Sequence, residues 1–208
     1  MTRRLQRGFF LKPTLDVSKA LIGKFLIHEY KGQKLGGMIV ETEAYIGKKD
    51  KAAHSYRGRR TPRTEVEYGA GGHVYIYMVY GMHYQLNFVT AGKEEPECVL
   101  IRALEPVAGI ETMKKLRKTR DLNNLTNGPG KLCQALHLDK TLYGADLCAR
   151  DSKLYIEDRG VKVGSREIKK GPRIGIDYAG PYWARVHWRF WLDRSWSRVY
   201  TFTKVESL

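Results

Sequence analysis

The stretch GGMIVETEAY, residues Gly36–Tyr45, decides the fold of this chain because it joins an apolar strand to two carboxylates and a tyrosine. Side chains alternate across a β-strand. One predicted face therefore carries Ile39, Glu41, Glu43 and Tyr45. The other face has a single polar group and is expected to face the core; it carries Met38, Val40, Thr42 and Ala44. Two interpretations of the acids remain open: a strand at the sheet edge whose carboxylates face water, or a central strand that presents them to a site.

The composition indicates a globular protein with an unusual charge. Of the 208 residues, 42% are hydrophobic, which suffices for one buried core and predicts a single domain over residues 1–208. Lys and Arg total 37 against 22 Asp and Glu, giving a net charge of +15. Such an excess attracts polyanions, so nucleic acid is the first predicted partner and an anionic membrane the second. A basic surface with no specific partner is the third interpretation.

Neither a membrane anchor nor a disulfide framework is indicated. No apolar run approaches the roughly 20 residues of a membrane-spanning helix, and the apolar part of the N-terminus, GFFL, is too short for a signal peptide. We therefore expect a cytoplasmic protein. The three cysteines are odd in number and have no CxxC spacing, so no disulfide or zinc site is predicted. Cys98 and Cys133 are expected to be small core residues.

The other patterns predict a mixed α/β (α+β) fold with a curved, mainly antiparallel sheet surrounded by helices. Further strands are expected over Phe25–Tyr30, Cys98–Leu104 and Leu154–Ile156. Helices are expected over Pro13–Gly23, from Glu105 onward, and from Lys131 onward in KLCQALHL. The first of these helices is expected to be capped by Thr14 or Asp16.

The segment HVYIYMVYGMHYQLNFVT, residues 73–90, alternates at period two on both sides of a turn, which predicts a protruding β-hairpin. Tyr75 and Tyr84 are expected to pack within it. Tyr80 lies at the tip, where a large ring is badly placed for burial but well placed to wedge between stacked bases. Asn87 is an amide in an apolar strand, so it is either a structural bridge or a reader of a ligand's hydrogen-bonding edge.

Basic residues gather in the polar loop after the opening strand. Four arginines fall within seven residues, close to His54: Arg57, Arg59, Arg60 and Arg63. This run is either a solvated loop or a rim that binds phosphate, and Thr61-Pro62 within it is a helix-start signature. A second candidate phosphate site is the start of the KLCQALHL helix with Lys131.

Two further features have open interpretations. Arg102 interrupts the apolar strand CVLIRAL, so it either pairs with a carboxylate of a neighbouring strand or lies in a solvated site. The C-terminal stretch mixes tryptophan with arginine and fits either a nucleic-acid surface or a segment that closes the core: Trp183, Arg185, Trp188, Arg189, Trp191, Arg194, Trp196 and Arg198.

Five segments in this order resemble the alkyladenine (3-methyladenine) DNA glycosylases of the mammalian type: ETEAY, AAHSYRGRRTPR, VYIYMVYGMHYQLNFV, CVLIRALEP and GPGKLCQAL. The resemblance implies that Glu43 activates the attacking water and that Arg102 helps to hold it. It implies pocket roles around the extruded base for Tyr45, His54, Tyr77 and Asn87, the last as a screen against guanine. Tyr80 would intercalate in the duplex. Contacts with the DNA backbone are expected from Arg59, Arg60, Arg63 and Lys131.

The function implied by the resemblance is base-excision repair by a monofunctional DNA glycosylase. Such an enzyme flips 3-methyladenine, 7-methylguanine, hypoxanthine or ethenoadenine out of duplex DNA, hydrolyses the N-glycosidic bond and leaves an abasic site. No metal or cofactor is needed, and we expect a monomer that binds double-stranded DNA, at a bacterial nucleoid or in a eukaryotic nucleus. The alternative is a non-catalytic nucleic-acid-binding protein, which leaves Glu43 beside Arg102 unexplained. Glu41 receives no role; its charge is expected to raise the pKa of Glu43.

Overall fold

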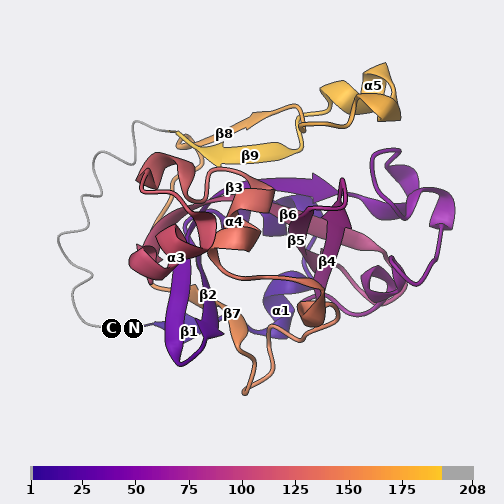
Figure 1. The fold of residues 1–208 in the computed structure, drawn as a ribbon. Helices are drawn as coiled ribbons and strands as arrows, with labels where there is room; N and C mark the ends of the chain where they lie inside the picture. The colour runs from indigo at the N-terminus through magenta and orange to yellow at the C-terminus, as the bar shows by residue number, and fades with distance from the viewer. Residues whose placement is uncertain (1, 194–208) are drawn as a thin grey trace.

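A computed structural model describes residues 2–193, and one nine-stranded sheet runs through this part of the chain (Figure 1). The strands are β1 (Arg3–Arg4), β2 (Phe25–Tyr30), β3 (Gln33–Tyr45), β4 (Val74–Val79), β5 (His83–Thr90), β6 (Glu97–Ala108), β7 (Leu154–Asp158), β8 (Ile168–Gly171) and β9 (Arg189–Leu192). The helices are α1 (Arg7–Phe10), α2 (Thr14–Leu21), α3 (Ile110–Arg117), α4 (Pro129–Ala135) and α5 (Pro181–Arg185). All pairings between these strands are antiparallel. The predicted fold class is confirmed.

The opening strand, β3, lies in the middle of the sheet. The strand order is β1-β7-β2-β3-β6-β5-β4, and the β8–β9 hairpin attaches to β3 through β9. Figure 1 shows this hairpin running along β3, above the rest of the sheet. The first part of β3 pairs with β2 up to Met38, and residues Glu41–Glu43 pair with β9. The sheet-edge interpretation of the two acids is therefore wrong.

A bulge in the middle of β3 changes which side chains face the core. The register against β6 shifts between Ile39 and Glu41 and again between Glu41 and Thr42. An extra residue in one strand interrupts the alternation of side chains. Ile39 and Thr42 are consequently both buried, whereas Val40 is only half-buried. The prediction that Ile39 faces away from the core is wrong, whereas Val40 does pack against the core, although it is only partly buried. Glu41 and Glu43 do share a face, on which both contact Arg102.

Helix α2 fixes the position of β3 from the core side. Val17 and Leu21 form its buried stripe, and its Ser18 hydroxyl lies 2.9 Å from the buried Thr42 hydroxyl. Thr42 also donates a hydrogen bond to the Ser18 carbonyl oxygen. The predicted helix is thus present, but neither Thr14 nor Asp16 caps it. The single polar group of the predicted core face is satisfied by this helix, as buried polar groups require.

Two predicted helix starts are wrong. Strand β6 continues through Glu105 and Pro106 to Ala108, because β3 offers partners as far as Gly36. Helix α3 starts only after Gly109, whose φ of +70° favours glycine and where a Cβ atom would lie 2.4 Å from Leu35. Thr61-Pro62 forms a turn that leads into a 3₁₀ helix, Glu65–Tyr68, and not into an α-helix.

The predicted hairpin is present as β4 and β5, with Tyr80, Gly81 and Met82 in the turn. Tyr80 and Gly81 both have positive φ, as tight hairpin turns of the primed types require. Cys98 and Cys133 are buried as expected. No helix within residues 2–193 is long and apolar enough to cross a membrane. Of the C-terminal Trp and Arg residues, Arg194, Trp196 and Arg198 lie outside the described residues.

Candidate active site

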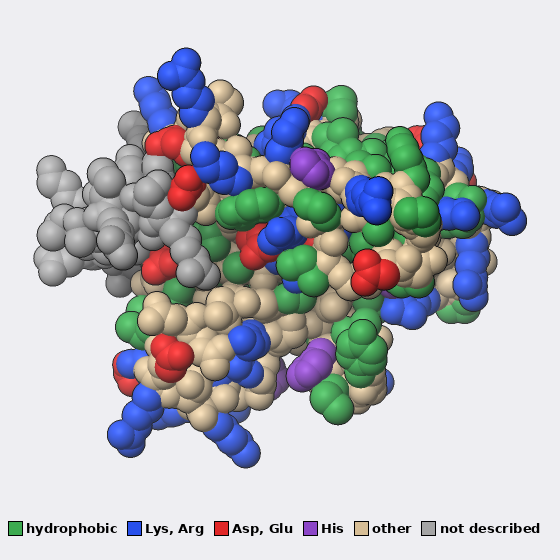
Figure 2. Space-filling model, turned by 90° about the horizontal axis from the view of Figure 1, so that it is seen from above, with side chains coloured by type: hydrophobic (Ala, Val, Ile, Leu, Met, Phe, Trp, Pro, Cys, Tyr) green, Lys and Arg blue, Asp and Glu red, His purple; other side chains and the backbone are tan. Residues whose placement is uncertain are grey.

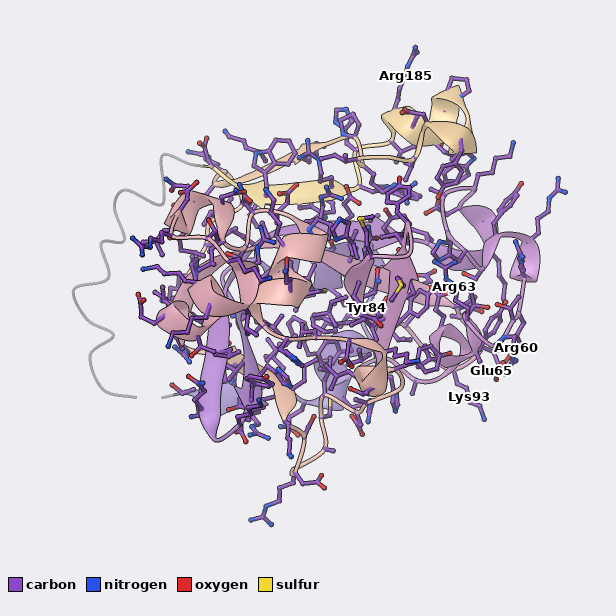
Figure 3. The ribbon with its side chains drawn as sticks, viewed as in Figure 1. Arg60, Arg63, Glu65, Tyr84, Lys93 and Arg185 are labelled. Carbon is purple, nitrogen blue, oxygen red and sulfur yellow. The ribbon has the colours of Figure 1, made fainter. Side chains whose placement is uncertain are left out.

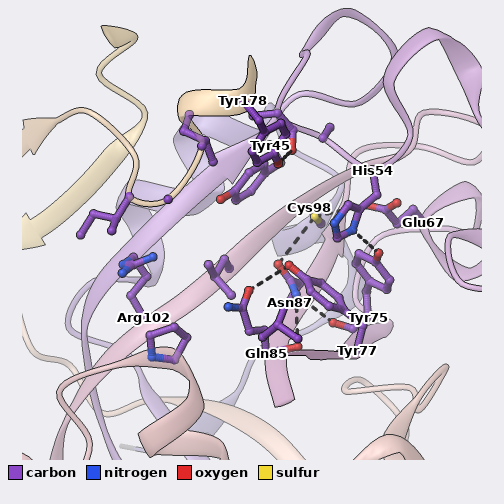
Figure 4. Close-up of a pocket in the computed structure, with 18 of the residues that line it drawn as sticks. Tyr45, His54, Glu67, Tyr75, Tyr77, Gln85, Asn87, Cys98, Arg102 and Tyr178 are labelled. Carbon is purple, nitrogen blue, oxygen red and sulfur yellow. Dashed lines mark hydrogen bonds between the residues drawn. The ribbon is translucent and has the colours of Figure 1, made fainter. Parts of the chain in front are cut away.

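A pocket of about 350 Å³ opens between the β4–β5 hairpin, the far end of β3 and the loop that follows β8. Its walls are largely aromatic (Figure 4): Tyr45, Tyr75, Tyr77 and Tyr178. Polar groups at the walls come from separate elements: His54, Glu67, Gln85, Asn87 and Arg102. The volume lies in the lower range for small-molecule sites, and aromatic walls with a few placed polar groups are typical of them.

Glu43 lies directly behind the wall of this pocket and has no exposed surface. Its Oε1 accepts a hydrogen bond of 2.8 Å from the Ile174 backbone N–H and lies 3.2 Å from Nη1 of Arg102. Its Oε2 accepts a bond of 2.9 Å from the Tyr45 hydroxyl. Burial raises the pKa of Glu43, and Arg102, the Ile174 amide and Tyr45 oppose the rise. The result is a buried carboxyl group that touches three residues of the pocket wall.

Arg102 joins the two acids of β3, which confirms the first of its two interpretations, and it also lines the pocket. Its Nε lies 3.3 Å from Oε1 of Glu41 without forming a hydrogen bond. Glu41 instead accepts a bond of 3.0 Å from Arg189 of β9. The pKa of Glu43 is raised first by burial. The expectation that the Glu41 charge adds to this rise stays a prediction.

A second ion pair, between Arg173 and Asp50, holds the loop that covers Glu43. Both side chains are fully buried, and Nη2 of Arg173 donates to Oδ1 of Asp50 at 2.9 Å. Nη1 donates to Oδ2 of the same carboxylate and to the Ala44 carbonyl oxygen. The guanidinium also lies over the Tyr45 ring, 4.7 Å from its centroid. Arg173 thereby fixes both Tyr45 and the position of the next residue, Ile174, whose amide contacts Glu43.

His54 is part of an aromatic cluster on the other side of the pocket. Its Nδ1 shares a hydrogen bond of 2.7 Å with the Tyr75 hydroxyl, and its ring meets Tyr77 edge-on at 4.7 Å. Burial, helped by the charges of Arg63 and Arg59, lowers the pKa of His54 to about 4. The imidazole is consequently neutral near pH 7, so it can offer one donor and one acceptor.

Asn87 is buried in β5 and lines the pocket. Its amide nitrogen donates to the backbone carbonyl oxygens of Tyr75, at 3.1 Å, and Gln85, at 3.3 Å. Its amide oxygen lies 3.9 Å from the Cys98 sulfur, whose single proton has a closer acceptor in Glu67, at 3.3 Å. Asn87 thus bridges β4 and β5, and it also presents an amide to the pocket. Both interpretations of this residue are compatible with its position.

Two exposed aromatic side chains line the pocket. Tyr80 is 89% exposed at the hairpin tip, and Tyr178 is also mostly exposed. Lys and Arg side chains project around the margin of the upper face of the molecule (Figure 2). An apolar rim within a basic surface is suited to a ligand that has both flat rings and phosphates.

Comparison with known proteins identifies the family. A family model described as methylpurine-DNA glycosylase matches residues 8–196. The chain belongs to this family. A relative from Desulfitobacterium hafniense (strain Y51), named "Putative 3-methyladenine DNA glycosylase", is 48% identical, over 93% of this chain and 97% of its own length. Relatives with the same name from Bacillus cytotoxicus and Clostridium acetobutylicum are 49% and 46% identical, over 90% and 91% of this chain and 95% and 94% of their own lengths.

Membership confirms the predicted enzyme class, a DNA-repair glycosylase that acts on DNA. Most of the site residues predicted from the sequence of this glycosylase lie at the one pocket. Six of them line it: Tyr45, His54, Tyr77, Tyr80, Asn87 and Arg102. Glu43 lies behind the pocket wall. No group of three His, Cys, Asp or Glu side chains within residues 2–193 is placed to hold a metal ion.

The expected DNA-backbone residues differ in their surroundings. Arg59 and Arg63 are exposed beside the pocket, and the Arg63 guanidinium lies 4.5 Å from the Tyr77 ring centroid. Arg60 is already paired with Glu65, which lies next to it in Figure 3, and with Glu94, at 2.6 and 3.0 Å. The Lys131 ammonium group donates to the side chains of Asn124 and Asn127. Arg60 and Lys131 would have to exchange these partners to bind a phosphate.

Four residues of the glycosylase site were not singled out from the sequence: Asp50, Glu67, Arg173 and Tyr178. Asp50 and Arg173 are 123 positions apart, and each stands in a polar segment without periodicity. Glu67 follows the arginine-rich loop and resembles one more surface charge. The proximity of Tyr178 to the pocket depends on the loop that Arg173 fixes. Only the three-dimensional structure brings these residues to the site.

Proposed function

We propose that this glycosylase rotates alkylated and deaminated purines out of duplex DNA into the pocket and hydrolyses their N-glycosidic bond with a water activated by Glu43. The product is an abasic site, and 3-methyladenine, 7-methylguanine, hypoxanthine and ethenoadenine are the proposed substrates. The observation that carries the proposal is the placement of Glu43. Its buried carboxyl group contacts Tyr45, Arg102 and Ile174, and all three line the aromatic pocket.

The pocket walls support a purine substrate. Tyr45 and Tyr77 come from different strands and offer aromatic surfaces to a flat base. A cationic ring over an aromatic face is favoured by about 0.5–2 kcal/mol, which benefits N-alkylated purines over normal ones. Neutral lesions such as hypoxanthine gain less, so hydrogen bonds from His54 and the amide of Asn87 must contribute more to their selection.

The environment of Glu43 supports a role as general base. Cleavage of the N-glycosidic bond builds positive charge on the sugar, which a nearby carboxylate stabilises while it takes a proton from water. Burial raises the pKa of Glu43 toward the working pH, where a base is most effective. Both oxygens are engaged in this structure. Among the described residues, Oε2 accepts only the bond from Tyr45 and so keeps a second acceptor position, which makes it the oxygen that can take a proton from the catalytic water.

The surface supports binding of double-stranded DNA by a single copy of the chain. A base inside the duplex is inaccessible, and its extrusion costs a few kcal/mol. Tyr80, exposed at the hairpin tip beside the pocket, is placed to fill the vacated space. The net charge of +15 supplies phosphate affinity that is independent of sequence.

Release of free bases from methylated duplex DNA tests the proposal. The wild-type protein should release 3-methyladenine and 7-methylguanine and leave alkali-labile sites. Glu43→Gln should still bind lesion DNA but lose excision by at least 100-fold, the scale of general-base catalysis. Glu111→Gln, which removes an exposed carboxylate of α3, is the matched control and should retain full activity. Wild-type release of no base, or full activity of Glu43→Gln, would contradict the mechanism.

A further inference from the structure

A second buried carboxyl group, Glu67, reaches the pocket on the side of His54 and Tyr75 (Figure 4). It belongs to the 3₁₀ helix Glu65–Tyr68 and is 1% exposed. Its Oε1 accepts a hydrogen bond from the Cys98 thiol at 3.3 Å. Its Oε2 is buried and has no hydrogen-bond partner among the described residues. The mechanism proposed above does not use Glu67.

Glu67 has fewer neighbouring groups than Glu43 to stabilise the negative charge of its carboxylate. Glu43 receives an arginine, a backbone amide and a tyrosine, whereas Glu67 receives only a thiol, which is a weak donor. A buried carboxylate without partners is costly and therefore tends to stay protonated. Burial raises the pKa of Glu67 to about 8, against small opposing effects of Cys98 and Arg63.

The groups around Glu67 are almost all neutral at pH 7. The titratable or charged groups that interact with it are Arg63 from the loop, Tyr68 from its own helix, Tyr75 and Tyr77 from β4, Cys98 from β6 and Tyr143. Neutral His54 stands beside them at the pocket. Arg63 is the one cation of this set, and it is exposed and lies over the outer ring of Tyr77. No strong counter-charge for Glu67 is present in this set.

We propose that Glu67 is a specificity-determining residue that pairs as a carboxylate with positively charged N-alkylated purines and is protonated when the pocket holds a neutral base. This inference rests on the proposed function. A purine nucleotide alkylated at N3 or N7, as in 3-methyladenine and 7-methylguanine, carries a positive charge, and such a ring in the pocket supplies the counter-charge that Glu67 lacks. Its binding therefore releases one proton from the Glu67 carboxyl group to solvent. A neutral purine such as hypoxanthine meets the protonated form, which offers an O–H donor.

The effect should appear in binding more than in the chemical step. The alkylated base loses its positive charge as the N-glycosidic bond breaks, so the carboxylate stabilises the bound lesion more than the transition state. An interaction of this kind lowers KM and does not raise kcat. Glu67 would thus increase capture of cationic lesions without accelerating their cleavage.

The test compares 3-methyladenine with hypoxanthine in one duplex sequence at several pH values. The ratio of their KM values, hypoxanthine over 3-methyladenine, removes effects common to both substrates, including the titration of Glu43. For a free enzyme in which Glu67 titrates near pH 8, the ratio in the wild-type protein should rise roughly 15-fold between about pH 6.5 and 8. Glu67→Gln keeps an acceptor for the Cys98 thiol but cannot ionise. Its ratio should be independent of pH, with KM for 3-methyladenine raised tenfold or more, KM for hypoxanthine within about twofold and kcat not lowered.

If Glu67→Gln folds poorly, the comparison is repeated with Glu67→Met, because the methionine side chain needs no polar partner. Glu111→Gln removes a negative charge far from the pocket and should keep the wild-type pH dependence. The inference would be overturned, and the proposed function would stand, if either Glu67 variant kept the wild-type pH dependence of the ratio. The same holds if a variant lost activity equally toward both substrates. A wild-type protein that releases neither base would overturn both.

Discussion

The buried pair of Arg173 and Asp50 gives a sharp test of how the site is held together. Asp50 accepts four hydrogen bonds: from Ile46, from Ala52 and twice from Arg173. These occupy the acceptor positions of both carboxylate oxygens. Asp50→Asn leaves one acceptor oxygen and an uncompensated guanidinium in a place that solvent does not reach. Because both side chains are fully buried, no reduction for solvent screening applies, and we expect a loss of about 3–5 kcal/mol in the free energy of unfolding.

The double variant Asp50→Asn/Arg173→Met separates charge pairing from packing. Arg173→Met alone leaves the Asp50 carboxylate without its cation and should lower the free energy of unfolding by a similar amount. With both changes no unpaired charge remains, so the double variant should be no less stable than either single variant, a coupling energy of about 3 kcal/mol or more. Urea unfolding followed by tryptophan fluorescence measures all four proteins. Costs below about 1 kcal/mol for the single variants, or additive costs in the double variant, would refute the argument.

The same variants should change catalysis through Glu43. Without Arg173, the loop no longer holds the Ile174 amide against the Glu43 carboxylate. That amide is one of the groups that keep the pKa of Glu43 from rising further. Under conditions in which the variant is folded, the acidic limb of the profile of kcat/KM against pH should move to higher pH. A variant that is only destabilised would show a lower kcat/KM at every pH, without a shift of the acidic limb.

Three further outcomes are expected. Tyr80→Ala should weaken binding to lesion duplex by the roughly 1–3 kcal/mol of one stacked ring but leave binding of a free damaged base unchanged; equal losses would mean that Tyr80 only packs. Asn87→Ser should admit normal guanine or its analogues to excision, and an unchanged substrate range would exclude a screening role. Glu67→Gln should gain stability relative to wild type as the pH rises from about 5 to 8, because native Glu67 holds a proton that the unfolded chain has lost; the gain is at most about 4 kcal/mol, and denaturant unfolding at both pH values measures it. A constant difference would contradict the raised pKa.

The sequence was sufficient to predict the features that repeat along the chain. The alternation of residues 73–90 predicted the hairpin and placed Tyr80 at its tip. The charge of Arg102 inside an apolar strand left two solutions, a carboxylate partner on a neighbouring strand or a solvated site, and the structure shows it in contact with Glu43 and Glu41 at the pocket wall. Both predictions follow from local physics, because a period of two and an isolated buried charge each have few solutions.

Features decided by distant contacts could not be predicted. The bulge at Val40 depends on β6 and β9, which lie on opposite sides of β3. The extension of β6 through Glu105 and Pro106 depends on their partners in β3, Met38 and Gly37, and this pairing overrides the helix-start signature. Glu67 stands between charged neighbours in a segment without periodicity, so no local signal shows that it is buried.

The bulge at Val40 also explains why two carboxylates on the same face of one strand, Glu41 and Glu43, acquire different surroundings. Before it, β3 is paired with β2 and contributes Ile39 to the core; after it, the free side of β3 is taken by β9. Glu41 thus meets Arg189 and stays partly exposed in an ion pair. Glu43, two residues further, lies under the loop fixed by Arg173 and is cut off from solvent. The same strand therefore supplies one acid that stabilises the β3–β9 junction and one whose raised pKa suits proton transfer.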